Sequence, residues 1–128
     1  MQAVDLATLW AESDAISLHC PLTDDNRGLL NAQTLARCKR GVIVINTARG
    51  GLIEEASLLA AVRSGQVAMA GLDSFAVEPM TPGHPFQGEK NIVLSPHIGG
   101  VTSDAYVNMG VGAAKNLLQV IARQTTAA

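Results

Sequence analysis

Gly41-Val42-Ile43-Val44-Ile45-Asn46 is an uninterrupted β-branched run that decides the fold class of this chain. A strand that is apolar on both faces is typical of a parallel sheet, so we expect this strand to be buried on both sides. Short apolar runs that end at turn residues predict three more strands, over 15–18, 67–72 and 92–94.

Helices are predicted between and beyond these strands from the spacing of apolar residues, over 4–11, 32–39, 56–63 and about 103–122. Asn31 and Thr102 are suitable N-caps, and Gly65 is a suitable helix end. The alternation of helices and strands predicts an α/β fold with a parallel sheet of about four strands. The basic cluster Arg37, Lys39 and Arg40 is interpreted as the end of the second helix, where cations favour the helix dipole.

The composition excludes several classes of protein. The 128 residues carry a formal net charge of −2, with 48% hydrophobic and 16% charged residues, so we expect no nucleic-acid partner and no disordered chain. No apolar stretch approaches the length of a membrane span, and no signal peptide is expected. Cys20 and Cys38 show no disulfide or metal spacing, which favours a reduced, cytoplasmic setting.

Side chains that could take part in catalysis or ligand binding follow each predicted strand. His19 follows the first strand, Arg49 the second, Asp73 and Glu78 the third, and His97 the fourth. Ligands of open α/β sheets bind beyond the carboxyl ends of the strands, so these residues are candidates for one site. Each also has a plainer interpretation: a surface arginine, turn or loop carboxylates, or a structural histidine. No metal site is expected, because the three histidines lie in separate loops without ligand spacing.

Four segments, in order, resemble the motifs of D-isomer-specific 2-hydroxyacid dehydrogenases. They are 13–23 (SDAISLHCPLT), 45–51 (INTARGG), 71–79 (GLDSFAVEP) and 95–100 (SPHIGG). The resemblance implies that residues 1–128 form a single partial domain, the C-terminal half of a Rossmann-like, doubly wound sheet. Three positions depart from the family pattern: Ser74 stands where an apolar residue is usual, and Ile53-Glu54 replaces Val-Asp.

The resemblance also implies an activity, the transfer of a hydride between NAD(H) and a D-2-hydroxy acid or 2-oxo acid. Arg49 would grip the substrate carboxylate, and His97, paired with Glu78, would be the acid–base. NAD is the expected cofactor, and NADP is not excluded. The expected cofactor contacts are His19, Cys20, Pro21, Thr47, Ala48, Arg49, Asp73, His97, Gly99 and Gly100.

The G-x-G-x-x-G phosphate loop and the substrate domain of this family are expected upstream of Met1. An alternative hypothesis is therefore a truncated, non-catalytic module that binds the cofactor or a partner. Without the missing half, an edge strand would be exposed, so we expect low stability or self-association as a homodimer or another oligomer. A thermally stable monomer at low concentration would contradict that expectation.

Overall fold

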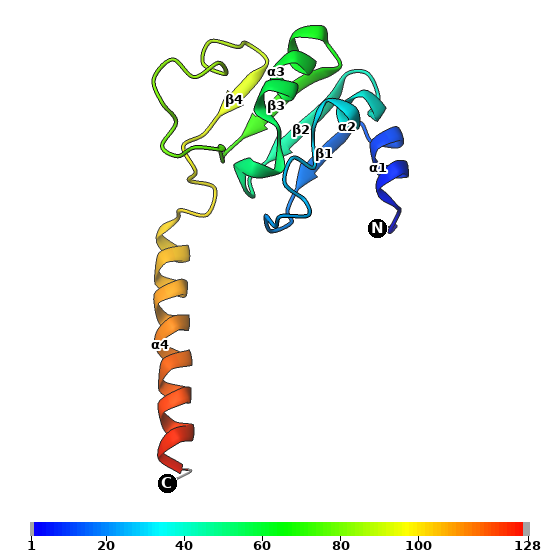
Figure 1. Cartoon of the computed structure of the whole chain (residues 1–128). Coiled ribbons are helices and arrows are strands. Elements are labelled where there is room, and N and C mark those ends of the chain that lie inside the picture. The colour runs from blue at the N-terminus through cyan, green and yellow to red at the C-terminus, as the bar shows by residue number, and fades with distance from the viewer. Residues whose placement is uncertain (1, 127–128) are drawn as a thin grey trace. The chain divides into compact units, whose positions relative to one another are not determined.

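The computed structural model describes residues 2–126, which fall into two compact units divided between His97 and Ile98. The first unit contains a four-stranded sheet of β1 (Ala15–Leu18), β2 (Val42–Asn46), β3 (Val67–Leu72) and β4 (Ile92–Leu94) (Figure 1). The strands lie in the order β1-β2-β3-β4, and every neighbouring pair is parallel. The predicted α/β, Rossmann-like fold with four parallel strands is thereby confirmed. That 1–128 form a single domain stays a prediction.

The helices of the first unit are α1 (Leu6–Glu12), α2 (Ala32–Arg37) and α3 (Glu55–Ser64), with a short 3₁₀ turn, η1 (Gly50–Leu52), before α3. Asn31 caps α2 as predicted, since its side chain accepts hydrogen bonds from the backbone N–H groups of Gln33 and Thr34. Gly65 ends α3 in the left-handed conformation, at φ 73°. Local chain chemistry thus sets both of these helix boundaries.

Of the basic cluster Arg37, Lys39 and Arg40, only Arg37 lies in the last turn of α2, because the helix stops at that residue. Lys39 lies beyond it and pairs with Asp14 at 2.9 Å. Arg40 donates instead to the backbone carbonyl of Ser64, 3.1 Å away, at the end of α3. The prediction was therefore right for Arg37 and wrong for the other two cations, whose partners lie far along the chain.

One face of the sheet carries the core of the first unit. Val42 and Val44 of β2 are 1% and 0% exposed and belong to one cluster with buried residues of α2 and α3. Ile43 and Ile45 point to the other face and remain 39% and 37% exposed. The prediction that β2 is buried on both faces was wrong for the described chain, because α2 and α3 contact each other and cover the same face. The predicted self-association stays a prediction.

Ser74 is a buried polar residue with an unsatisfied hydroxyl. Its side chain is 3% exposed, and its Oγ has no hydrogen-bond partner among the described residues. An unpaired buried hydroxyl costs about 1–3 kcal/mol. We therefore expect Ser74→Ala to raise the free energy of unfolding by about 1 kcal/mol in urea titrations. Ser64→Ala is the matched control: it removes a hydroxyl that donates to the Ala61 carbonyl, so it should not stabilise the protein. Equal effects of the two variants would contradict the expectation.

The second unit contains one long helix, α4 (Ser103–Thr126). Thr102 caps it as predicted, because its Oγ1 accepts a hydrogen bond from the backbone N–H of Ala105 at 3.0 Å. The helix runs past the predicted end near 122, since no glycine or proline interrupts the residues that follow. Its apolar residues include Val107, Leu117 and Leu118, each more than 60% exposed. Among the described residues, no helix is both long enough and apolar enough to cross a membrane.

Candidate active site

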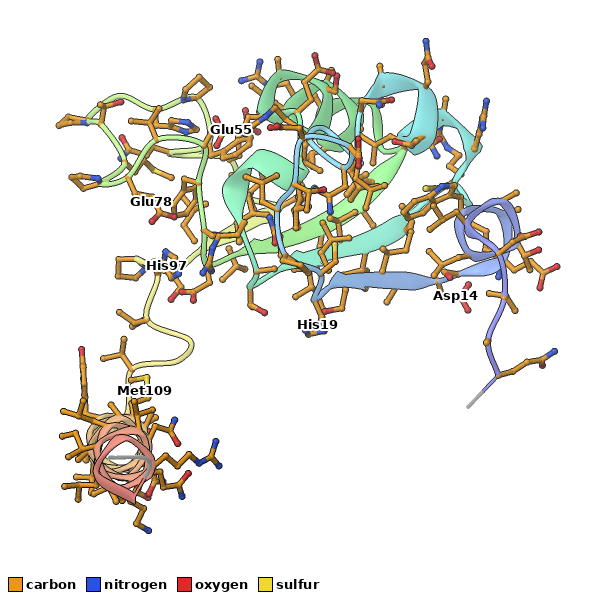
Figure 2. The ribbon with its side chains drawn as sticks, turned by 60° about the horizontal axis from the view of Figure 1, so that its bottom comes forward. Asp14, His19, Glu55, Glu78, His97 and Met109 are labelled. Atoms are coloured by element: carbon orange, nitrogen blue, oxygen red, sulfur yellow. The ribbon has the colours of Figure 1, made fainter. Side chains whose placement is uncertain are left out.

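The parallel sheet brings the predicted site residues to one edge. Because all four strands run the same way, their carboxyl ends lie together, and His19, Arg49, Asp73 and His97 follow β1, β2, β3 and β4 in turn. Figure 2 shows Glu78 and His97 near one another, and His19 farther along the sheet. The fold therefore gathers chemistry from four separated segments.

Glu78 and His97 form a carboxylate–imidazole pair. Glu78 Oε2 lies 2.7 Å from His97 Nδ1, although the two residues are 19 positions apart in the chain. The second carboxylate oxygen, Oε1, accepts the backbone N–H of Phe75 at 2.8 Å. With Nδ1 turned toward the carboxylate, the other ring nitrogen, Nε2, is left for a substrate. The His97 side chain is 41% exposed and the Glu78 side chain is 35% exposed, so the pair is open to solvent.

These contacts shift the ionisation of Glu78. The hydrogen bond from His97 is the largest cause that lowers the pKa of the Glu78 carboxyl, followed by the hydrogen bond from the Phe75 N–H. Desolvation is the next largest cause and raises this pKa, and the positive charges of His97 and Arg49 lower it by smaller amounts. Glu78 is therefore an anion at neutral pH, as a partner that orients an imidazole and stabilises its charged form must be.

The backbone of His97 adopts the left-handed conformation, with φ 57°. Few residues other than glycine do so, and such conformations cost on the order of 1–3 kcal/mol. They persist where the surrounding contacts hold the residue in place, often at functional sites. The strand pairing ends just before it, and the His97 N–H donates to the Ser95 carbonyl at 3.0 Å.

Arg49 lies in a loop that Asn46 organises. Asn46 is fully buried at the end of β2, and its Nδ2 donates to the Arg49 carbonyl at 2.9 Å while its Oδ1 accepts the Ala48 N–H at 3.1 Å. The Arg49 side chain is exposed, and its Nη1 donates to the Ala48 carbonyl at 2.7 Å. Sequence reasoning missed this role of Asn46. The signal was present, since asparagine at the end of a strand commonly hydrogen-bonds the backbone of the next turn.

Most of the predicted cofactor contacts that follow β1 and β2 line one hollow. His19, Cys20, Pro21, Ala48 and Arg49 border it, together with Leu22. The lining combines apolar side chains, small backbone-exposing residues and one cation, which suits a ligand with flat rings and a negative charge. The residues present therefore fit a dinucleotide.

The other predicted contacts are placed as follows. Thr47 is exposed beside the hollow, and His19 Nε2 lies 2.8 Å from the Ser17 hydroxyl. Asp73 is 5% exposed at the end of β3, where its N–H donates to the Asn46 carbonyl. Gly99 and Gly100 belong to the second unit, and their cofactor contacts stay predictions. Residues 2–126 contain no group of three side chains arranged to hold a metal ion.

The lowered Glu78 pKa makes a prediction about stability in acid. A carboxylate whose pKa is depressed by folding adds stability above its unfolded pKa, about 4.3, and loses it as the pH falls through the folded value. The unfolding free energies of the wild type and Glu78→Gln should therefore differ most above the unfolded pKa of about 4.3 and converge as the pH falls below it. Urea titrations across this range test it, and a constant difference would contradict the lowered pKa.

Comparison with known proteins decides the family. Residues 1–99 match the family described as "D-isomer specific 2-hydroxyacid dehydrogenase, NAD binding domain". The chain belongs to this dehydrogenase family. It is 47% identical over 113 residues to a hydroxypyruvate reductase of Thermotoga maritima, covering 87% of this chain and 37% of that protein. Two further relatives are glyoxylate reductases, and the chain spans about a third of the length of these curated proteins.

Solved structures of the dehydrogenase family share the fold. A glyoxylate reductase from Paecilomyes thermophila superposes with a TM-score of 0.86 at 36% identity, over 92% of this chain and 36% of that one. A family member from Xanthobacter autotrophicus Py2, solved in complex with NADPH and MES, gives a TM-score of 0.70 at 44% identity, over 73% of this chain and 30% of that one. The chain thus has the Rossmann-like fold of this oxidoreductase family and matches the family's NAD-binding domain over residues 1–99.

Proposed function

We propose that the chain carries the catalytic residues of an NAD-dependent oxidoreductase that transfers a hydride between NAD(H) and a D-2-hydroxy acid or 2-oxo acid. The observation that carries the proposal is the 2.7 Å contact between Glu78 and His97 at the carboxyl edge of the sheet. A carboxylate on Nδ1 fixes the tautomer and orientation of the ring and leaves Nε2 to exchange a proton.

Arg49 is the proposed anchor of the substrate. A guanidinium can hold a carboxylate with two parallel hydrogen bonds. The Arg49 side chain is exposed after β2, and β3 separates β2 from β4, the strand that His97 follows. In the direction of reduction, His97 Nε2 donates a proton to the carbonyl oxygen; in oxidation it removes the proton from the hydroxyl. Glu78 stabilises the imidazolium, which is the form of His97 before it donates the proton in reduction and after it accepts the proton in oxidation.

The cofactor would lie along the strand ends. His19, Cys20, Pro21, Thr47, Ala48 and Asp73 are the proposed contacts, all of them in the first unit. When bound, the nicotinamide supplies or accepts the hydride. Cys20 takes part through its backbone and needs no reactive thiol. Both NADH and NADPH are candidates, since the Xanthobacter relative was solved with NADPH.

The alternative is a non-catalytic module that binds the cofactor or a partner. It concerns residues 1–128 taken alone, which span about a third of the length of the curated relatives. The two functions differ in turnover and can be separated by experiment.

Purified protein is incubated with NADH or NADPH and with glyoxylate, hydroxypyruvate or pyruvate, and loss of reduced cofactor is followed by absorbance. Binding of each cofactor is measured in parallel by calorimetry. Turnover with any of the three acids would contradict the non-catalytic module. Cofactor binding without turnover would contradict catalysis by this chain.

A further inference from the structure

A second carboxylate–imidazole pair lies beside the first. Glu55 Oε2, at the start of α3, is 3.3 Å from Nε2 of His84, which comes from the irregular loop between β3 and β4. The Glu55 side chain is 25% exposed and the His84 side chain is 16% exposed, so this second pair is more buried than Glu78 and His97. Figure 2 shows Glu55 on the same side of the first unit as Glu78 and His97.

Both carboxylates hold the same turn. Glu78 Oε1 accepts the backbone N–H of Phe75 at 2.8 Å, and Glu55 Oε1 accepts the N–H of the next residue, Ala76, at 2.9 Å. Hydrogen bonds to a charged acceptor are stronger than neutral ones. The Phe75–Ala76 turn is therefore fixed by two anions that come from different parts of the chain.

His84 is itself held by packing and by a hydrogen bond. Its ring meets Phe75 and Phe86 edge to face, with centroids 6.4 Å and 4.9 Å away. The Phe86 N–H donates to His84 Nδ1 at 3.3 Å. In a neutral imidazole whose Nδ1 accepts, the proton is on Nε2, and that is the nitrogen that faces Glu55. The tautomer assigned from this network therefore lets His84 donate to Glu55.

The turn also lies against the loop that carries Arg49. An ideal Cβ on Gly50 would lie 1.9 Å from the carbonyl carbon of Phe75 and 2.4 Å from the nitrogen of Ala76, so the two backbones are in direct contact. The turn thus touches Glu78 through one amide and the residue after Arg49 through its backbone. The position of the turn therefore affects both Glu78 and the loop that carries Arg49.

We propose that Glu55, oriented by His84, is a positioning residue that fixes the Phe75–Ala76 turn and thereby holds the Glu78 carboxylate opposite His97. The inference rests on the proposed function of Arg49, Glu78 and His97, but it concerns their geometry. Neither Glu55 nor His84 borders the hollow at the ends of β1 and β2.

The test uses the full 128-residue chain and amide NMR. The Phe75 N–H reports the ionisation of Glu78, because it donates to that carboxylate. Glu55→Ala should raise the pKa of Glu78 toward its ordinary range and accelerate hydrogen exchange at Phe75 and Ala76 about three- to tenfold, as expected for losing one hydrogen bond. Glu55→Gln keeps an oxygen for the Ala76 N–H and should restore most of the protection.

Glu54→Ala is the matched control. Glu54 is the adjacent carboxylate, also at the start of α3, but it pairs with the hydroxyl of Ser57 and not with the turn. It should lower stability as Glu55→Ala does by weakening the helix N-terminus, yet leave the Phe75 titration unchanged. Equal titrations in Glu54→Ala and Glu55→Ala would show a purely structural role and overturn the proposal.

If Glu55→Ala does not fold, His84→Phe replaces it. Phenylalanine keeps a ring between Phe75 and Phe86 but removes the donor to Glu55, so exchange at both amides should still accelerate. Unchanged exchange at Phe75 would overturn the proposal. None of these readouts needs turnover, so an inactive chain with a responsive Phe75 amide would contradict the proposed function and leave the positioning role standing.

Discussion

Replacing Gly50 with alanine is expected to lower the free energy of unfolding by about 3–5 kcal/mol, a large part of the stability of a domain this size. The added Cβ would lie 1.9 Å from the carbonyl carbon and 2.1 Å from the carbonyl oxygen of Phe75. Both atoms are backbone, so no side chain can rotate away, and the Phe75–Ala76 turn must move. Urea unfolding followed by circular dichroism measures the change.

Gly71→Ala is the control for this experiment. Gly71 lies in β3, has no atom within 4 Å of its ideal Cβ and has no positive φ. Its replacement should change stability by less than about 1 kcal/mol and can even stabilise the chain by reducing the freedom of the unfolded state. If Gly50→Ala were as mild as Gly71→Ala, the close contact between the two loops would not exist in solution.

His97→Asn is expected to lower turnover by about 10²–10⁴-fold, which is the range that a positioned general acid–base contributes. Asparagine is chosen because it tolerates the left-handed conformation at φ 57° better than most residues, so the backbone should stay in place. An amide cannot exchange a proton at neutral pH, and the binding of reduced cofactor should change little.

Lys90→Gln provides the comparison for that loss. Lys90 is exposed and precedes β4, whereas His97 follows the strand at its other end. Its replacement should leave turnover within about twofold, a change of under 1 kcal/mol. A loss of less than tenfold in His97→Asn, with the fold intact by circular dichroism, would contradict an acid–base role for His97.

The strands were predictable because their sequence patterns are local. The predicted strands 15–18, 67–72 and 92–94 have the observed bounds, and only the first residue of 41–46 falls outside β2. The helices were located correctly, with ends displaced by a few residues where capping contacts, not periodicity, set the limit. The turn η1 was not predicted, because packing of Gly50 against Phe75 depends on a distant part of the chain.

Motifs predicted which residues belong to the candidate site but not the contacts between them. Glu78 and His97 were named from their segments, yet no local pattern shows that a 13-residue loop over 79–91 brings them to 2.7 Å. Glu55 and His84 were missed as a pair for the same reason, since 29 positions separate them.

The order of the strands in space equals their order along the chain. During synthesis on a ribosome, β1 can pair with β2 as soon as both have emerged, and each later strand adds to an existing edge without displacing an earlier one. His97 is the last residue of the first unit, so the imidazole arrives after Arg49 and Glu78 are already in place. A nascent chain therefore cannot bring His97 to Glu78 until the last of the four described strands has been made.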